Sequence, residues 1–473
     1  MSRLSLPSYL AGTAFTDDQW IDVSNPWNGE NVGRVACATR VQLETAIEAH
    51  RAPSEPLTRY ERSQVLTKTG ELLVEHREEL AQLITAESGL CLKETRYEVG
   101  RACDVFSFAA MEALRDDGET FSGDIAPAGK ARKIFTLREP VALVSAITPF
   151  NHPLNQVAHK LAPAIAAGAP VILKPSEKTP LTAVRLVELI YEAGLPGRML
   201  SCIHGGLDEI TRPMIRDERV DLVTFTGSAK VGKEIAATAG YKKTCLELGG
   251  HSPLIVLDDA DIGLAARLAC EGCFRNSGQR CTAVRRILVQ KGVLEEFTER
   301  FLELAQTYRC GDPTDEATVV GTVIDEAAAN ALAEAVSEAE SKGAKILLGS
   351  GNEGALMPPT ILADVPRTAR LATRECFGPL APIFAVDDLE DAIALSNATP
   401  YGLSSAIVTR SLDSAIQAVK GIKAGATNVN EIPGYRLELS PFGGFKDSGL
   451  GIKEGVIEAI KTMTNVKTFS LPW

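Results

Sequence analysis

One of the ten cysteines lies in a polar segment whose residues suit a reactive thiol. It is Cys281, in NSGQRCTA (276–283), where Gly, Gln, Arg and Thr replace the apolar neighbours of a buried structural cysteine. The positive charge of Arg280, directly before it, should favour the thiolate, which is the form that attacks carbonyl carbon atoms. We therefore expect Cys281 to be a nucleophile.

A cysteine nucleophile needs a partner that accepts a proton. The chain has six histidines, and none of them lies in a recognisable catalytic motif. Glu247, in CLELGGHSP (245–253), ends an apolar strand and precedes Gly249 and Gly250, which let another group approach the backbone closely. Glu247 is the candidate base, and a solvated strand end is the alternative that its own context leaves open.

The segment TFTGSAKVGKE (224–234) could bind phosphate groups. Gly227 and Lys233 resemble a phosphate loop, but Glu234 stands where such a loop needs a Ser or Thr hydroxyl to hold magnesium. A P-loop nucleotide hydrolase is therefore disfavoured. Ser228 at a helix start still suits a pyrophosphate. Because this segment lacks GxGxxG, a nicotinamide cofactor must bind here in a non-standard way.

Composition limits the classes of function. The 473 residues exceed one ordinary core, so we expect two or three folding units. A formal charge of −12 and a pI near 5.2 disfavour nucleic acid and anionic membranes as partners, which leaves small molecules. Long apolar runs and a signal-peptide pattern are both lacking in the sequence, so we expect a cytoplasmic protein.

The scattered cysteines fit a reducing compartment. Cys270 and Cys273 have the spacing of a metal half-site, but no second pair of Cys or His follows at zinc spacing. We expect no metal, and we assign both residues to helix packing and Cys376 to a structural role.

Short apolar runs alternate with amphipathic stretches, which is typical of parallel strands joined by crossover helices. This pattern predicts an α/β fold with a doubly wound sheet. One crossover helix should be capped by Thr179, with Pro180 at its first position. The predicted strands are 141–147, 170–174, 221–225, 345–349 and 381–386, the predicted helices include 229–239, 262–275 and 294–307, and a protruding hairpin strand (130–138) and a β-prone tail (465–473) complete the set.

Seven motifs resemble the aldehyde dehydrogenase superfamily in their residues, order and spacing. They span most of the chain, so coincidence is improbable. The motifs are TPFNHP (148–153), ILKPSE (172–177), FTGS (225–228), ELGG (247–250), GQRC (278–281), ECFGP (375–379) and SPFGGFKDSG (440–449).

The resemblance implies a division of the chain and an assembly. The hairpin and the tail should pair between subunits, because a single chain would leave their edges unprotected. A homodimer or homotetramer is therefore expected. The implied parts are a Rossmann-type NAD-binding domain (1–119 and 139–247), an α/β catalytic domain (248–446) and a small β oligomerisation element (120–138 and 463–473).

The resemblance also assigns catalytic roles. It makes Cys281 the nucleophile, Glu247 the base that activates water, and Asn151 a donor to the oxyanion of a thiohemiacetal together with the Cys281 backbone amide. Loss of hydride to NAD would leave a thioester on Cys281. Because Glu247 is present, hydrolysis to the free acid is expected. A catalytically silent structural protein is the alternative, and the presence of all three residues argues against it.

The family pattern further implies the contacts of the cofactor. Lys174 and Glu177 would contact the adenosine ribose hydroxyls, and Glu375 would contact the nicotinamide ribose beside Phe377. The carboxylate of Glu177 would repel the extra phosphate of NADP, so NAD is expected. The other implied cofactor residues are Thr148, Pro149, Phe150, Ser176, Gly227, Ser228, Leu248 and Gly249.

Three arginines could select the substrate. Arg101, Arg280 and Arg436 could clamp a phosphonate, phosphate, sulfonate or carboxylate, beside Asn151 and His152. Because Arg436 is far from Cys281 in the sequence, it should act on the substrate anion without affecting the thiol.

A finer resemblance concerns the substrate itself. TRYEVGRACDV and IPGYRLELSPFGG are similar to segments of the dehydrogenases that oxidise phosphonoacetaldehyde to phosphonoacetate. Lactaldehyde, glyceraldehyde 3-phosphate, a sulfonated aldehyde and succinate semialdehyde remain open as alternatives, and the sequence does not rank these anions.

Overall fold

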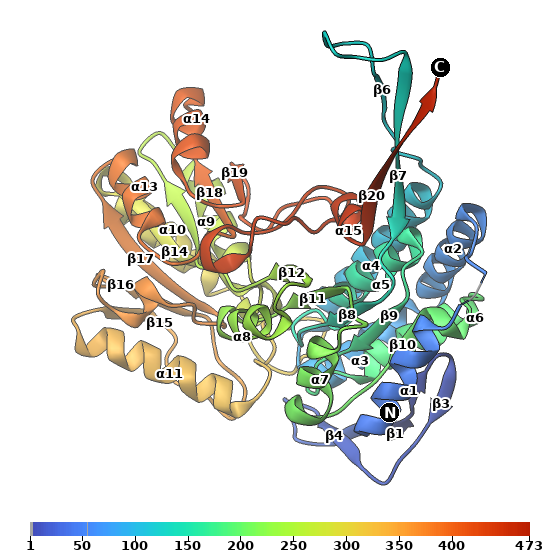
Figure 1. Cartoon of the computed structure of the whole chain (residues 1–473). Helices are drawn as coiled ribbons and strands as arrows, with labels where there is room; N and C mark the ends of the chain where they lie inside the picture. The colour runs from blue at the N-terminus through green and yellow to red at the C-terminus, as the bar shows by residue number, and fades with distance from the viewer. Residues whose placement is uncertain (1–2, 54) are drawn as a thin grey trace.

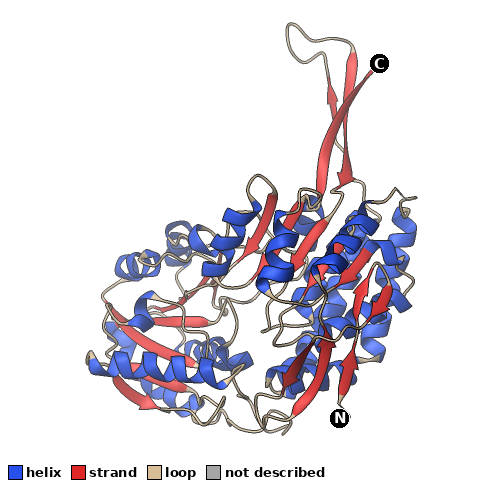
Figure 2. Cartoon of the chain, turned by 60° about the horizontal axis from the view of Figure 1, so that its bottom comes forward, coloured by secondary structure: helices blue, strands red, loops and turns tan. Residues whose placement is uncertain are grey.

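The computed structural model describes residues 3–53 and 55–473, so residues 1–2 and 54 of the expected first domain lie outside the described residues. The N-terminal and C-terminal halves form two lobes, and a narrow sheet protrudes beyond them (Figure 1). Helices flank the sheets of both lobes (Figure 2). The fold is α/β, as predicted, and no helix within the described ranges is long and apolar enough to cross a membrane.

The first lobe is built on a seven-stranded sheet in the order β12-β11-β8-β9-β10-β2-β3. Strands β8 to β12 are parallel, and β2 and β3 extend one edge in antiparallel pairing. Every residue of β8, β9, β10 and β11 is buried, as expected for central parallel strands. The strands are β2 (Ser8–Leu10), β3 (Thr13–Phe15), β8 (Val144–Ile147), β9 (Val171–Lys174), β10 (Leu200–Cys202), β11 (Leu222–Thr226) and β12 (Lys243–Glu247).

The helices of this lobe include the predicted one at 229–239, which the structure places at those residues. A smaller sheet, β1 (Leu4–Leu6), β5 (Asn31–Ala36) and β4 (Trp20–Ser24), lies beside them. The helices are α1 (Arg40–Arg51), α2 (Arg59–Glu75), α3 (Arg77–Ser88), α4 (Leu92–Ala113), α5 (Asn155–Ala167), α6 (Leu181–Glu192), α7 (Arg212–Arg216) and α8 (Ala229–Ala239).

The predicted cap of α6 is wrong. The helix begins at Leu181 with Pro180 before it, and the Thr179 side chain does not cap it. Instead, the carboxylate of Glu87 accepts hydrogen bonds from the amides of Leu181 (2.8 Å) and Thr182 (3.1 Å). A buried glutamate of α3 therefore satisfies the free amides of this helix, which local sequence could not indicate.

The second lobe is built on a seven-stranded sheet in the order β15-β16-β17-β14-β13-β18-β19. All pairs are parallel except β15 with β16. The strands are β13 (Ser252–Val256), β14 (Val284–Gln290), β15 (Lys345–Leu348), β16 (Thr360–Ala363), β17 (Leu380–Val386), β18 (Ser404–Val408) and β19 (Ala426–Val429), and the helices are α9 (Ile262–Phe274), α10 (Leu294–Ala305), α11 (Glu326–Ser341), α12 (Arg370–Thr373), α13 (Leu389–Asn397) and α14 (Leu412–Gly421).

The protruding sheet has the order β20-β7-β6, with β6 (Thr120–Ser122), β7 (Arg132–Pro140) and β20 (Thr464–Pro472), which follows α15 (Val456–Thr462). The tail pairs with the hairpin of its own chain, antiparallel, from Thr464 opposite Pro140 to Pro472 opposite Arg132. The outer edge of β20 is unpaired within the described chain, and Phe469, Leu471 and Trp473 are exposed. Pairing between subunits therefore has the long edge of β20 available, besides the shorter outer edge of β6, and the homodimer or homotetramer stays a prediction.

Candidate active site

The predicted cofactor and catalytic motifs meet at one edge of the first sheet. Thr148 follows β8, Lys174 ends β9, Gly227 follows β11 and Glu247 ends β12. These four strands are neighbours and parallel, and the register pairs Ile147 with Lys174. The carboxyl ends of parallel strands are where doubly wound folds bind ligands. The fold therefore brings together segments that lie up to a hundred residues apart.

A cavity of about 200 Å³ opens at this edge. Lys174 and Glu177 line it together with the apolar side chains of Phe225 and Ile235. The Lys174 ammonium lies 3.4 Å from Glu177 Oε1, and burial lowers the pKa of Lys174. Ser228 caps α8 at the same edge, with its hydroxyl accepting from a backbone amide of the first turn. These features fit the adenosine diphosphate half of a dinucleotide. The apolar cavity suits the adenine, Lys174 and Glu177 suit the ribose hydroxyls, and the N-terminus of α8 suits the pyrophosphate.

The other predicted residues of this edge differ in their surroundings. The buried Thr148 hydroxyl has no hydrogen-bond partner in the described part of the chain. Pro149 and Phe150 are half-buried in the loop after β8. The Ser176 hydroxyl accepts from the Lys178 amide (3.2 Å) and so stabilises its own turn.

Residues of the second lobe complete the predicted cofactor set. Glu375 Oε1 accepts from the Gly250 amide (3.1 Å), and a Cβ atom at Gly249 would lie 2.1 Å from Glu375 Oε2. A side chain at Gly249 would therefore require the Glu375 carboxylate to move. The Phe377 ring meets Phe150 edge to face, with ring centroids 6.0 Å apart. The ECFGP motif therefore faces the motifs at the edge of the first sheet.

Leu248 and Gly227 are held by backbone contacts. The Leu248 amide donates to the Ser448 carbonyl (3.0 Å), and the Gly227 amide donates to the Glu247 carbonyl (3.0 Å). The Ser448 hydroxyl donates to the Gly249 carbonyl (2.7 Å). The SPFGGFKDSG motif (440–449) is thereby fixed, through Ser448, against the strand end that carries Glu247.

A further run, GSGNEG (349–354), has the letters of the GxGxxG fingerprint. It follows β15, an antiparallel edge strand, and the next helix begins only at Arg370. The fingerprint binds a dinucleotide only when a helix begins directly after a parallel strand. This run is therefore a surface loop, and the cofactor features lie at the edge of the first sheet.

The loop before Cys281 has an unusual backbone. Asn276, Ser277 and Gly278 are consecutive left-handed residues, with φ of 57°, 50° and 67°. Non-glycine residues adopt this conformation only where contacts hold them. Asn276 Nδ2 donates to the Asn151 carbonyl (3.1 Å), and Asn151 Nδ2 donates to the Gln279 carbonyl (2.8 Å). The two loops interlock, so the Asn151 amide lies beside the nucleophile's segment with its second hydrogen available for an oxyanion.

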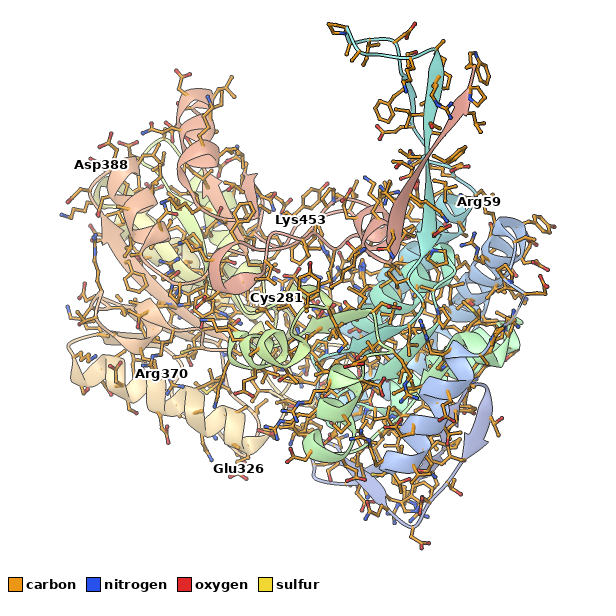
Figure 3. All side chains as sticks on the ribbon, viewed as in Figure 1. Arg59, Cys281, Glu326, Arg370, Asp388 and Lys453 are labelled. Atoms are coloured by element: carbon orange, nitrogen blue, oxygen red, sulfur yellow. The ribbon has the colours of Figure 1, made fainter. Side chains whose placement is uncertain are left out.

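Cys281, the predicted nucleophile, lies where the two lobes meet (Figure 3). Burial is the main influence on the thiol and raises the pKa of Cys281 to about 12. The carboxylate of Glu247 raises this pKa further, whereas the charge of Arg436 lowers it more than that of Arg280 does. Arg280 lowers the pKa of Cys281, in the expected direction, but burial outweighs it, and the expectation that Arg436 leaves the thiol unaffected is wrong.

Glu247 is almost fully buried, and its Oε1 has no hydrogen-bond partner within the described residues. Burial, and next the charge of Glu454, raise the pKa of Glu247 well above its usual range. The Lys160 ammonium, which donates to Glu454 (2.7 Å), lowers it only partly. Burial therefore opposes the ionisation of both the thiol and the carboxyl, although each group acts in its ionised form.

A pH prediction follows from these shifts. Because both pKa values are raised, the reactive forms become more populated as the pH increases, so the rate of Cys281 alkylation by iodoacetamide should rise from about pH 7 to 10. Arg436→Leu should slow alkylation at each pH by at least about threefold, because it removes a charge that favours the thiolate.

Arg280→Leu is the matched control for this experiment, since its charge lowers the pKa of Cys281 less. Alkylation is followed by mass spectrometry of the peptide that contains Cys281, so the other cysteines do not interfere. An equal or larger effect of Arg280→Leu would contradict this ranking.

The three predicted substrate arginines do not form a free clamp. Arg101 Nε donates to Glu438 Oε1, and Arg436 Nη2 lies 3.5 Å from Glu438 Oε2. Arg280 has no ion pair in the described chain, and its Nη2 donates to the Glu271 carbonyl (3.2 Å). The charge of Arg101 lowers the pKa of Arg280, and both Arg280 and Arg436 influence Cys281, so the three guanidiniums share one region. Sequence reasoning missed Glu438, whose signal was a glutamate between leucines in LEL (437–439).

Helix α4 connects these segments through one face. Glu94, Glu98 and Arg101 recur at a spacing of four and three residues, which places them on one side of a helix. Glu94 pairs with Arg275 (3.0 Å), and Glu98 Oε2 lies 3.4 Å from Nδ1 of the predicted substrate residue His152. Glu98 also accepts from two backbone amides at the start of α5. The spacing in ETRYEVGR could have indicated this face.

Comparison with known proteins agrees with this arrangement. The model of the aldehyde dehydrogenase family matches residues 13–469. The 3-sulfolactaldehyde dehydrogenase of Priestia aryabhattai is 38% identical over 464 residues, covering 98% of this chain and 97% of the relative. The mitochondrial succinate-semialdehyde dehydrogenase of Arabidopsis thaliana is 40% identical over 449 residues, covering 93% of this chain and 84% of the relative.

A solved structure shows the same fold. The NADP-dependent glyceraldehyde-3-phosphate dehydrogenase of Bacillus halodurans C-125, complexed with NADP, superposes with a TM-score of 0.95 at 33% identity and covers 99% of each chain. Because the family model and these relatives extend over nearly the whole length, this chain belongs to the aldehyde dehydrogenase family.

Proposed function

We propose that the chain oxidises phosphonoacetaldehyde to phosphonoacetate with NAD as cofactor. The observation that carries the proposal is the charge beside Cys281. Arg280 and Arg436 act on the thiol, Arg101 acts on Arg280, and Glu438 pairs with Arg101 and Arg436, so three guanidiniums and one carboxylate give these four side chains a net charge of two positive units. A phosphonate carries nearly two negative charges at about pH 8, whereas a sulfonate or carboxylate carries one. The two negative charges of the phosphonate would therefore neutralise the net positive charge of these side chains.

In this proposal the Cys281 sulfur, after losing its proton, attacks the aldehyde carbon. Asn151 Nδ2 and the Cys281 amide donate to the oxyanion, which is typically worth about a hundredfold or more in rate. When bound, the nicotinamide cofactor would serve as the hydride acceptor. Glu247 then takes a proton from a water molecule whose oxygen attacks the thioester on Cys281, and the carbon–sulfur bond breaks to release the acid. Glu247 lies beside β11 and the glycines of ELGG, within the same interlocked region.

Glu177 supports NAD as the cofactor. Its side chain lies at the cavity beside Lys174, where two ribose hydroxyls would find an acceptor and a 2′-phosphate would meet a carboxylate. NAD-dependent oxidation of 3-sulfolactaldehyde is the second candidate. The named relative from Priestia aryabhattai favours it, because the same arginines would bind a sulfonate.

A substrate panel followed by NADH absorbance tests the proposal. We expect kcat/KM to be highest for phosphonoacetaldehyde, lower for 3-sulfolactaldehyde and succinate semialdehyde, and lowest for propanal, which has no anionic head group. A higher value for 3-sulfolactaldehyde would select the second candidate. Equal values for propanal and the anionic aldehydes would exclude an anion subsite.

Arg280→Leu should raise KM for phosphonoacetaldehyde selectively. Arg280 has no carboxylate partner in the described chain, so its guanidinium is the one most available to a substrate anion. Charge-assisted hydrogen bonds of about 1.5–3 kcal/mol imply a ten- to hundredfold loss of kcat/KM. The value for propanal should change little. Equal losses for the two aldehydes would assign Arg280 a structural role.

A further inference from the structure

Glu438 lies at the centre of a buried charge cluster that the proposed mechanism does not use. Its carboxylate accepts from Arg101 Nε, lies 2.5 Å from His159 Nε2 and lies 3.5 Å from Arg436 Nη2. Its side chain is 5% exposed. Burial lowers the pKa of His159, so the imidazole is neutral and donates to Glu438. Glu438 itself is ionised, because the charges of Arg436 and Arg101 outweigh its burial and hold its pKa far below the usual range.

This carboxylate faces the same cations that an anionic substrate would use. The guanidinium of Arg436 also lies over the Phe442 ring, 4.0 Å from its centroid, so ring and carboxylate together fix its plane. Its Nη1 is buried and has no partner among the described residues, and the same holds for Arg280 Nε. The cluster thus contains two hydrogen-bond donors without a described partner, Arg436 Nη1 and Arg280 Nε, together with the negative charge of Glu438.

We propose that Glu438 is a specificity-determining residue that lowers the positive charge of the anion subsite by one unit, which allows singly charged head groups to compete with doubly charged ones. The inference rests on the proposed function only in requiring an anionic substrate. The attraction of a subsite for an anion scales with the product of their charges. A change of one unit in the subsite therefore acts twice as strongly on a dianion as on a monoanion.

Phosphonoacetaldehyde and sulfoacetaldehyde form a matched pair for this test. Their carbon skeletons are the same and both head groups are tetrahedral, but at about pH 8 they differ by one negative charge. A substitution that displaces the arginines weakens the attraction of the subsite and lowers the ratio of the two kcat/KM values, whereas removal of a negative charge from the subsite raises this ratio. The direction of the change therefore separates the charge of the subsite from its geometry.

Glu438→Gln keeps the size of the side chain and removes the charge. We expect the phosphonate-to-sulfonate ratio of kcat/KM to rise at least about tenfold, with little change for propanal. Glu112→Gln is the control, because Glu112 is a carboxylate of the same helix α4 that pairs with Arg115 instead of the three substrate arginines. It should leave the ratio unchanged. An unchanged or lower ratio in Glu438→Gln would overturn the inference, as would equal losses for all three aldehydes.

A second variant covers the case in which Glu438→Gln does not fold. Arg101→Gln combined with Glu438→Gln removes both partners and leaves no unpaired charge, which buried pairs tolerate better. Against Arg101→Gln alone, the double variant should show the same rise in the ratio, and no rise would overturn the inference. If the unmodified enzyme does not oxidise phosphonoacetaldehyde, the proposed function fails. The inference is then tested by the ratio of the inhibition constants of methylphosphonate and methanesulfonate against the aldehyde that is oxidised.

Discussion

Cys281→Ala should abolish aldehyde oxidation, lowering kcat by at least about ten-thousandfold, while the affinity for NAD changes little. Without the sulfur there is no covalent intermediate from which hydride can leave, and removal of a nucleophile has effects of this size in other enzymes. The cavity with Lys174 and Glu177 belongs to other segments, so it should keep its shape.

Oxidation is measured by NADH absorbance, and NAD binding by calorimetry. Cys270→Ala is the control, because Cys270 is buried in α9 and packs in the core of the second lobe. It should retain turnover with a modest loss of thermal stability. Residual turnover of Cys281→Ala within about tenfold of the unmodified enzyme would refute the proposed nucleophile.

Glu247→Gln should give one rapid equivalent of NADH per active site and then stall, with steady-state turnover reduced at least about a hundredfold. The reason is that hydride leaves before water attacks, and the amide cannot take the proton of that water. Glutamine should fit the site, because it has the size of glutamate and because Glu247 Oε1 has no hydrogen-bond partner in the described chain.

Stopped-flow absorbance measures the burst, and mass spectrometry detects the acyl group that should accumulate on Cys281. Loss of the burst, with the alkylation rate of Cys281 unchanged, would place the base in the first half of the reaction. A steady state equal to that of the unmodified enzyme would remove Glu247 from the mechanism altogether.

Elements fixed by local pattern were predictable from the sequence. The sequence predicted a helix at 229–239 after the glycine and serine, and α8 has these bounds. The apolar runs near 144, 171 and 222 predicted β8, β9 and β11. The meeting of the motifs also followed from the sequence, because parallel strands place their carboxyl ends at one edge. The sequence did not predict that the tail pairs with the hairpin of its own chain. This pairing depends on where the end of α15 places the first residue of β20.

Properties that depend on burial and on distant charges were not predictable. Arg280 is adjacent to Cys281 in sequence, yet Arg436 has the larger influence on the thiol, and burial outweighs both. Glu438 pairs with Arg101 and Arg436 and so reduces the positive charge that they offer to a substrate. Nothing in the LEL segment indicates that two arginines contact this glutamate. The cap of α6 by Glu87 is a similar case, because the acceptor lies on another helix.

Helix α4 has a consequence for how the substrate range of this enzyme can evolve. Along one face it binds the segment before Cys281 through Glu94, the loop with His152 through Glu98, and the cluster around Glu438 through Arg101. Substitutions on that face will therefore be strongly epistatic with three remote parts of the chain. A lineage that adopts a new aldehyde through α4 should acquire compensating changes in those segments, and grafting a single residue from a relative should rarely transfer its specificity.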